Sequence, residues 1–284
     1  MKRTNQQFIR CVALGAWIAG GLGAMGQALA QAAYPSPDAA AEALASSIAT
    51  GDNDKLRHVL GADFQRYVPA GSVSHDDIYA FLAAWSKHHE IVMTGPASAA
   101  FVVGQHDWSF PAPLVKNQRG WHFDVREGAR EMQRRRIDRN EIAAMQTLRE
   151  LCEAQRRFQA LAGQGQPAQR IVSRQGQYDG LYWEEGGQQA PGPSPLSDDA
   201  LVMGVDVPVD AALHGYRYSI VAPTDDKGCA FAAWPAAYGK TGHFSFMIGA
   251  GGRMVERDYG RQSAAADFDR PNQPMSREWT EVLP

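Results

Sequence analysis

The sequence predicts an α+β protein of two lobes joined by a long amphipathic helix. Residues 33–126 begin with segments that carry apolar side chains at helical spacing and end with short runs of aromatic and β-branched residues. Residues 127–162 return to a strong helical pattern, and residues 163–284 end in alternating strand patterns. Helices that come in a block before strands are typical of α+β proteins. We therefore expect N-terminal helices with a curled antiparallel sheet, then the long helix, then an antiparallel sheet packed on it.

Residues 1–32 have the pattern of a secretory signal peptide. A basic start with Lys2, Arg3 and Arg10 precedes an apolar run of 16 residues, "CVALGAWIAGGLGAMG". The segment "QALAQA" then places small residues at the −3 and −1 positions of a cleavage site after Ala30 or Ala32. An uncleaved membrane anchor is the alternative, but the apolar run is shorter than the roughly 20 residues that a spanning helix needs. We therefore expect a cleaved protein that is periplasmic or secreted.

The expected mature chain is mildly acidic and keeps two cysteines, Cys152 and Cys229. Without the leader it has 25 basic and 31 acidic side chains, which gives a net charge of −6. This balance argues against nucleic acid as a partner, and no second apolar run is long enough to span a bilayer. An even number of cysteines permits one disulfide in an oxidising compartment, and two buried thiols are the alternative.

Three helices and three strands are predicted in the first lobe. Ser36 can cap the first helix, with Pro37 at its first position, and Gly51 can end it. The segment "NDKLRHVLG" predicts a short second helix, and "SHDDIYAFLAAWSKHHEI" predicts a third because its apolar residues recur at helical spacing. Strands are expected in "SAAFVVG", "HDWSFPAPLVK" and "GWHFDVR".

The strongest helix is predicted in "DRNEIAAMQTLRELCEAQRRFQALAG". Asp138 or Asn140 can cap its beginning, and Gly163 can end it. The basic run before it, "QRRRIDR", indicates a solvated helix start or linker, and contact with an acidic partner or lipid headgroups is the alternative. One face of the helix is expected to be buried: Ile142, Met145, Leu148, Cys152, Gln155 and Phe158.

The second lobe is expected to begin with a long loop and to end in four strands. The segment "GLYWEEGGQQAPGPSPLSDDA" is rich in Gly and Pro and indicates irregular structure. "GKTG" and "GAGG" lack the helix that must follow a phosphate-binding or dinucleotide-binding loop, so we interpret both as turns. The tail "DFDRPNQPMSREWTEVLP" is expected to be irregular. The strands are expected at residues 215–222, 229–235, 243–248 and 253–259.

His122 and Asp124 are the candidate catalytic residues. Their i, i+2 spacing puts both on one face of a strand, where an inward imidazole and carboxylate would be a base and the group that orients it. Trp121 and Phe123 then occupy the other face, and that face is equally able to form the core. The other histidines of this half lack the short spacing of zinc ligands, so neither a metal nor a cofactor is expected.

Four aromatic residues are candidates for ligand binding. They lie near Gly-rich segments, where exposed aromatic rings would bind a sugar or a peptide strand, and packing into small local cores is the alternative. The four are Tyr182, Trp183, Trp234 and Tyr238.

Several segments together resemble an uncharacterised bacterial family, domain of unknown function 2950. They are "YPSPDAAAEAL", "GLYW", "HGYRYSIV" and "AWPAAYGKTGHFSFMIGAGGRMVERDYG". The resemblance covers nearly the whole mature chain, implies export to the bacterial envelope and brings no reaction with it. Residues 33–126 are also similar to nuclear-transport-factor-2-like domains. The second lobe resembles pilin-type modules, although the long helix lacks the apolar N-terminal half of a true pilin.

The pilin-like resemblance implies a disulfide between Cys152 and Cys229. It packs the C-terminal sheet on the inner face of the long helix, where Cys152 lies. Cys229 alternates with Phe231 and Ala233 along one strand face, so the two thiols are expected to meet if their Cα atoms come within disulfide range.

Two functions remain open at this point. The preferred one is a non-enzymatic exported protein that binds an unknown envelope protein or glycan. The alternative is a small-ligand binder or an enzyme that uses a cavity in the first lobe. A deep pocket lined by imidazole and carboxylate groups would favour the alternative, and a lobe filled with apolar side chains would favour binding through the surface.

Overall fold

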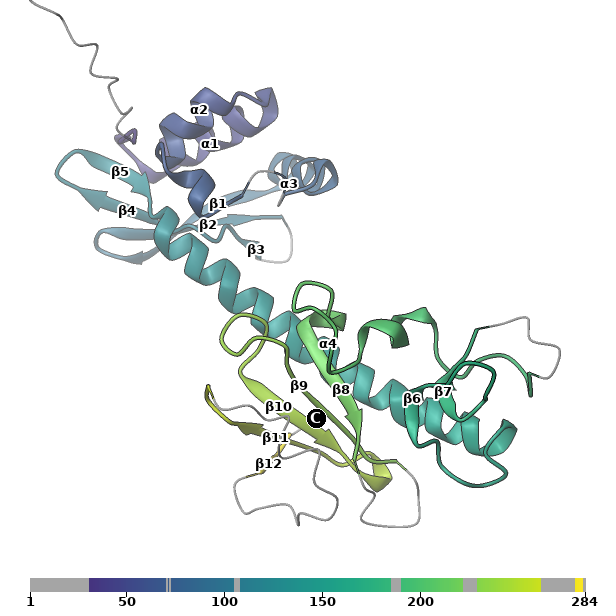
Figure 1. The fold of residues 1–284 in the computed structure, drawn as a ribbon. Coiled ribbons are helices and arrows are strands. Elements are labelled where there is room, and N and C mark those ends of the chain that lie inside the picture. The colour runs from purple at the N-terminus through teal and green to yellow at the C-terminus, as the bar shows by residue number, and fades with distance from the viewer. Residues whose placement is uncertain are drawn as a thin grey trace, which may run out of the picture.

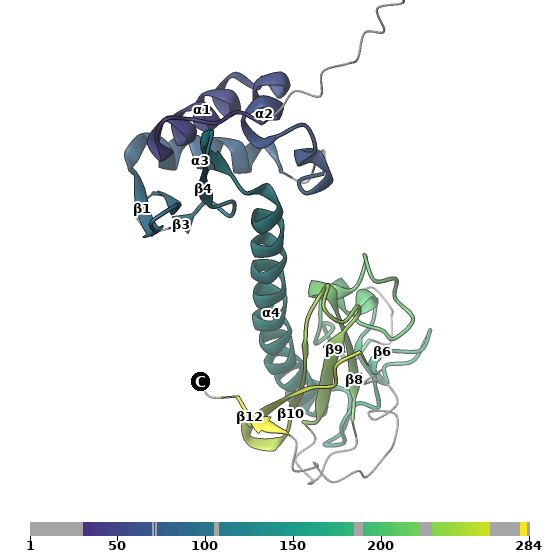
Figure 2. The same cartoon turned by 90° about the vertical axis from the view of Figure 1, so that its left-hand side faces the viewer.

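The expected α+β class is confirmed in a computed structural model, which shows two lobes on one long helix (Figures 1 and 2). The structure describes residues 31–69, 71, 73–104, 108–184, 190–221, 229–261 and 279–282. The predicted signal peptide therefore falls almost wholly outside the described residues. Each lobe has its own cluster of buried apolar side chains, and the long helix α4 contributes to the second cluster.

The helices of the first lobe begin and end where local capping chemistry dictates. The Ser36 hydroxyl accepts a hydrogen bond from Ala39 N, and Gly51 ends the first helix with a φ of 62°, so both predicted ends are confirmed. Ser74 and Asp77 form a reciprocal capping box at the third helix. The bounds are α1 Pro37–Thr50, α2 Asn53–Leu60, the 3₁₀ turn η1 Phe64–Arg66, and α3 His75–Lys87.

The first sheet is antiparallel and has five strands, where three were expected. The segment after α3 is not helical: His88 is extended, and a strand that the sequence did not predict follows it. The predicted strand "HDWSFPAPLVK" is divided in two, because Pro111 and Pro113 cannot donate to a ladder. The order is β1-β2-β4-β5, and β3 also pairs with β2. The bounds are β1 His89–Gly95, β2 Ser98–Val103, β3 Trp108–Ser109, β4 Leu114–Asn117 and β5 Gly120–Phe123.

The concave interior of the first lobe is filled with aromatic rings. Phe101 is fully buried, and its ring centroid lies 5.1 Å from that of Trp85 and 5.9 Å from that of Phe110. Phe110 continues the cluster to Phe123, at 5.6 Å between centroids. Tilted and edge-to-face contacts of this kind fill volume and fix ring orientation. The interior is therefore an apolar core.

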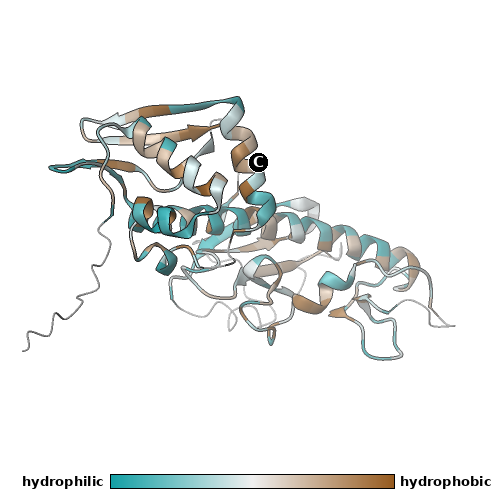
Figure 3. Cartoon of the chain, turned by 90° about the horizontal axis from the view of Figure 1, so that it is seen from above, coloured by the Kyte–Doolittle hydropathy of each residue, from teal (hydrophilic) through white to brown (hydrophobic). Residues whose placement is uncertain are grey.

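Helix α4, Val125–Leu161, begins well before the expected caps. The Asp124 carboxylate accepts a hydrogen bond from Glu127 N at 2.9 Å and is the actual N-cap, while Asp138 and Asn140 lie inside the helix. The prediction of Asp138 or Asn140 as the cap was therefore wrong. The local cap was placed too late because this first half has no apolar stripe, and hydrophilic colours dominate the helix between the lobes in Figure 3.

Ion pairs support this charged part of α4. Glu127 pairs with Arg130 and Arg134, at 2.5 and 3.0 Å, and Glu131 pairs with Arg134 and Arg135, at 2.8 and 2.7 Å. Hydrogen bonds from Arg134 hold the pKa of Glu127 below its usual range. The spacings of three, four and seven residues bring these side chains onto one side of the helix. The basic run is thus helical, and Arg135 also donates to Ser109 O in the first lobe, at 2.8 Å.

The second half of α4 packs against the C-terminal sheet. Leu148, Leu151 and Phe158 are buried there, as is Cys152. Ile142, which was expected on the buried face, is 52% exposed, so that part of the prediction was wrong. The part of α4 that joins this core cluster begins at Ala144, two residues later than the spacing suggested.

The second sheet is antiparallel in the order β12-β11-β10-β9-β8. Each of the four strands expected in this lobe is present, with ends that differ by two residues at most. The tail, expected to be irregular, contributes a short fifth strand, and its residues 267–278 and 283–284 lie outside the described part. The long loop also holds one strand of a small parallel pair, β6-β7. The bounds are β6 Arg170–Val172, β7 Gly180–Tyr182, β8 Tyr216–Ile220, β9 Phe231–Pro235, β10 Phe244–Ile248, β11 Met254–Asp258 and β12 Thr280–Glu281. Three 3₁₀ turns complete the lobe: η2 Asp198–Val202, η3 Leu213–Gly215 and η4 Ala250–Gly252.

A disulfide joins the long helix to this sheet. Cys152 and Cys229 are bonded in the structure, with their Cα atoms 5.2 Å apart. That separation lies within the range that disulfides require. Phe231 and Ala233 lie in the same buried cluster as Cys229, as the alternation along the strand indicated. The cross-link therefore lies inside the core of the second lobe.

Candidate functional site

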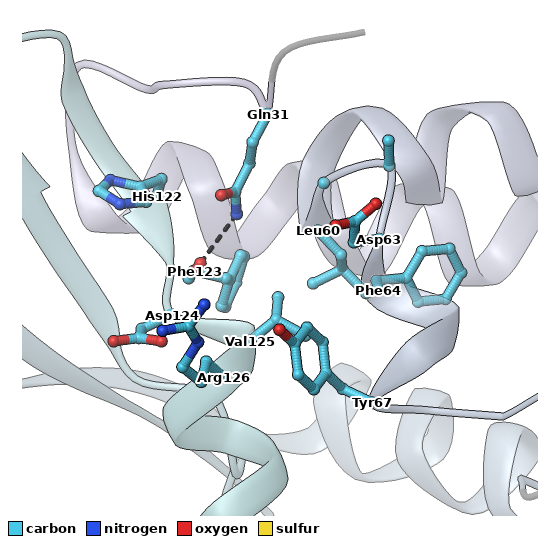
Figure 4. Close-up of a pocket in the computed structure, with 12 residues that line it drawn as sticks. Gln31, Leu60, Asp63, Phe64, Tyr67, His122, Phe123, Asp124, Val125 and Arg126 are labelled. Atoms are coloured by element: carbon cyan, nitrogen blue, oxygen red, sulfur yellow. Dashed lines mark hydrogen bonds between the residues drawn. The ribbon is translucent and has the colours of Figure 1, made fainter. Parts of the chain in front are cut away.

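The groove that contains His122 and Asp124 lies at the outer side of the first lobe, between the end of α2 and the start of α4. Figure 4 shows its walls, with Gln31 pointing down between His122 and the α2–η1 segment. The groove is open and has a volume of about 500 Å³. The residues that line it are Gln31, Leu60, Gly61, Ala62, Asp63, Phe64, Tyr67, His122, Phe123, Asp124, Val125 and Arg126.

His122 is half-buried on β5, opposite Val115 of β4. Its neighbours Trp121 and Phe123 are 6% and 1% exposed and belong to the core, so the other strand face is the buried one. The Nδ1 atom of His122 is buried and has no hydrogen-bond partner among the described residues. His122 therefore stands at the edge of the lobe and not in its aromatic interior.

Asp124 serves as the cap of α4. Its Oδ1 atom accepts from Glu127 N, and no hydrogen bond between Asp124 and His122 is found in the described part of the chain. The two side chains line the same groove, but a base held by its orienting carboxylate is not formed. The groove instead offers separate polar groups: an imidazole, the carboxylates of Asp63 and Asp124, and the guanidinium of Arg126.

The four aromatic candidates do not form one site. Trp183 is 4% exposed in the core beside α4, and its Nε1 donates to Gly192 O at 3.2 Å. Trp234 is 5% exposed and alternates with Ala233, so it lies on the sheet face that points away from α4. Tyr182 is half-buried on β7. Tyr238 is 36% exposed, and its hydroxyl donates to Asp258 Oδ2 at 3.2 Å.

The "GKTG" loop at residues 239–242 is held by side chains of α4. Gln133 donates to Lys240 O at 2.6 Å, and Asn140 donates to Thr241 O at 2.9 Å. The carboxylate of Glu141 accepts from His243 N and Phe244 N, at 2.8 and 3.2 Å. Since these backbone groups already have partners and a strand follows, the loop is a turn that fastens the sheet to the helix.

Glu141 also influences a second carboxyl group, that of Glu256 on β11. Burial, and then the charge of Glu141, raise the pKa of Glu256 above its ordinary value. A carboxyl group with a raised pKa in the folded state binds its proton more tightly there than in the unfolded chain. Protonated Glu256 therefore stabilises the folded state at pH values below the ordinary carboxyl pKa. This stabilisation is lost as the pH rises through the pKa that Glu256 has in the folded state.

We expect Glu256→Gln to raise the stability of the second lobe at neutral pH and to flatten its pH dependence above the ordinary carboxyl pKa. The reason is that the substitution removes a partly buried charge that is repelled by Glu141. Urea unfolding across a pH series measures both effects, with Glu184→Gln, at an exposed carboxyl of the same lobe, as the control. Equal pH profiles for Glu256→Gln and the unchanged protein would contradict the proximity of the two carboxylates.

Metal ligation finds no support in the described ranges. No group of three or more His, Cys, Asp or Glu side chains is placed to hold an ion there. No helix in this part of the chain is long and apolar enough to cross a membrane.

The fold and the groove define a two-lobed α+β protein whose second lobe is cross-linked to a shared helix. The chain belongs to the family described as protein of unknown function, DUF2950, whose model matches residues 31–282. The family expected from the sequence is therefore confirmed. No curated protein and no solved structure matches the chain, so the likenesses to nuclear-transport-factor-2-like domains and to pilins stay predictions.

Two surface features were missed at the level of sequence. The leader pattern allows cleavage on either side of Gln31 and does not indicate that this residue forms part of the groove wall. Residues 201–209 received no assignment from the sequence, although they expose three large aliphatic side chains. Those residues, Leu201, Val205 and Val209, are 55%, 46% and 42% exposed. The dense run of aliphatic residues in "LVMGVDVPV" was the available signal.

Proposed function

We propose that this protein is exported to the bacterial envelope and acts there by binding a protein partner, without catalysis. The bonded pair Cys152–Cys229 supports the export part of the proposal, because structural disulfides persist in oxidising compartments. The basic and apolar leader pattern of residues 1–32 supports it independently. The aromatic filling of the first lobe supports binding through the surface over chemistry in a deep cavity.

The observation that carries the binding part is an aliphatic ridge, defined here as Leu201, Val205 and Val209. It lies on a segment that is fixed at both ends, where Ala200 and Ala212 are buried, and in its middle, where Met203 is buried. Tyr218 N of β8 donates to Met203 O at 2.9 Å, and Arg217 Nη2 donates to Val207 O at 3.1 Å. The ridge side chains therefore point outward from an ordered segment. Their apolar surface is exposed to water in the free protein, and a bound partner would cover it.

Charges around the aliphatic ridge indicate the kind of partner. Four exposed carboxylates lie beside or within it in sequence, and the guanidinium of Arg217 is bonded to the ridge segment itself. Negative charge disfavours anionic lipid and nucleic acid, and it favours a protein surface with an apolar groove and a basic rim. The four carboxylates belong to Asp198, Asp199, Asp206 and Asp210.

A photo-crosslinking residue placed at position 205 tests this proposal in envelope preparations of the native host. We expect a discrete adduct of defined mass that forms from position 205 but not from position 142, where Ile142 is an equally exposed aliphatic residue of the charged helix. Changing Leu201 and Val209 to Ser should abolish the adduct and leave the melting temperature unchanged, since exposed side chains contribute little to folding. Equal labelling from positions 205 and 142 would contradict a specific partner at the ridge.

The alternative proposal is a small-ligand site in the groove beside His122. The specific observation in its favour is the buried Nδ1 of His122, which lacks a partner among the described residues. A thermal-shift screen with small acids, sugars and peptidoglycan fragments separates the two proposals. A shift that disappears in His122→Ala would support the groove and count against the ridge as the sole binding surface.

A further inference from the structure

The first described residues, 31–34, are built into the first lobe. Tyr34 N donates to Trp121 O, and Trp121 N donates to Tyr34 O, both at 2.8 Å. These reciprocal bonds add the segment to the free edge of β5 as an antiparallel bridge. Ala32 N donates to His58 O in α2, also at 2.8 Å. The segment thus ties α2 to the edge of the sheet.

Gly120 permits this close approach. Its φ is +132°, a conformation that favours glycine, and a Cβ atom there would lie 2.5 Å from Tyr34 O. Any larger residue at position 120 would therefore push the segment away from β5. The local sequence of β5 is suited to receiving residues 31–34.

The side chain of Gln31 fills part of the groove. Its Nε2 atom donates to Phe123 O at 2.8 Å and to Val59 O at 3.2 Å, so it links β5 to α2 (Figure 4). Its aliphatic part lies over Gly61, where a Cβ atom would meet it at ordinary contact distance. Both hydrogen-bond donors of the amide therefore have partners, and two backbone carbonyls in the groove are satisfied by them.

These contacts distinguish between the two cleavage sites that the leader offers. Cleavage after Ala32 would remove Gln31 and Ala32, and with them three hydrogen bonds between the segment and the lobe. It would also leave Val59 O and Phe123 O without these partners. Cleavage after Ala30 keeps all of them.

We propose that the leader is removed after Ala30, so that the mature protein begins with Gln31 and keeps its carboxamide in the groove. The inference rests on the proposed export, since only a secreted chain meets the protease that removes such leaders. It goes beyond that proposal because it assigns the peptide bond that is cleaved, between Ala30 and Gln31, and because it gives Gln31 a structural role in the groove.

The inference is tested by expressing the full chain with its own leader in a bacterial host. The intact mass of the product is measured, and its N-terminus is sequenced. We expect a chain that begins at Gln31. A chain that begins at Ala33 would overturn the inference and leave export standing. An uncleaved chain would overturn both, so the two failures are distinguishable.

Two leader variants provide matched controls. Ala28 is at the −3 position of the first site only, and Ala32 is at the −1 position of the second site only. We expect Ala28→Leu to abolish the chain that begins at Gln31, and Ala32→Leu to leave cleavage after Ala30 unchanged. The reverse pattern would overturn the assignment.

The docking of Gln31 is tested separately by thermal unfolding. The purified chain 33–284 should melt at a lower temperature than the chain 31–284, and Gln31→Ala in the chain 31–284 should melt between them. Equal melting temperatures would contradict the docking of Gln31.

Discussion

Loss of the disulfide is expected to lower the stability of the second lobe by about 4 kcal/mol, which is the largest single effect anticipated for this protein. Cys152 and Cys229 are separated by 77 positions, so the bond excludes many conformations of the unfolded chain. In the folded state it ties the second half of the long helix to the residues just before β9, and both cysteines are buried. Removing it should therefore affect the second lobe far more than the first.

Guanidinium unfolding with and without reductant measures this effect on an unchanged sequence, and Cys152→Ala with Cys229→Ala serves as the matched variant. Hydrogen exchange reports the lobes separately. We expect faster exchange in β8–β10 and in the second half of α4, and unchanged exchange in β2 and β5. A denaturation midpoint that does not move on reduction would show that the two thiols are not bonded in the purified protein.

Leu148→Ala is expected to cost about 3 kcal/mol, within the range of about 2–5 kcal/mol measured for fully buried leucines. Leu148 has no exposed surface and lies in the core cluster shared by α4 and the sheet. Shortening it removes apolar contacts and leaves a cavity that a disulfide-tethered helix closes only in part.

Ile142→Ala is the matched control on the same helix. Ile142 is 52% exposed, so its truncation is expected to cost less than about 0.5 kcal/mol. Urea unfolding of both variants gives the comparison. Similar losses for the two substitutions would mean that the buried face of α4 is placed incorrectly, since the sequence pattern assigned both residues to that face.

Local signals explain why much of the fold could be predicted. The ends of α1 follow from Ser36 and Gly51, which act through hydrogen bonds and backbone conformation within a few residues. The strands of the second sheet follow from alternation, since Phe246 and Ile248 lie in the buried cluster beside α4. Signals of this kind do not depend on distant parts of the chain.

Other elements lack such signals. Strand β1 was missed because its residues are mostly exposed on both faces, so Val92 and Met93 show no alternation between buried and exposed positions. The cap of α4 was misplaced at Asp138 or Asn140 because the stability of its first half comes from ion pairs such as Glu131–Arg135 and not from an apolar face. Both cases depend on the charged or exposed surface, where hydrophobic periodicity carries no information.

The candidate site was predicted only in part. The i, i+2 rule correctly separated the core residues Trp121 and Phe123 from His122. It could not show that the carboxylate of Asp124 would cap a helix that begins one residue later. The contribution of Gln31 depends on contacts with Val59 and Phe123, which are distant in sequence and come together only in the folded lobe.

Thiol trapping on the protein recovered from its native compartment tests the central claim most directly, namely that this is an exported protein with an oxidised second lobe. Cells that express the full chain are fractionated, denatured in the presence of an alkylating agent, and analysed by mass spectrometry with and without prior reduction. We expect the protein in the envelope or the medium, with Cys152 and Cys229 alkylated only after reduction. Recovery from the cytosolic fraction with both thiols alkylated before reduction would contradict the account.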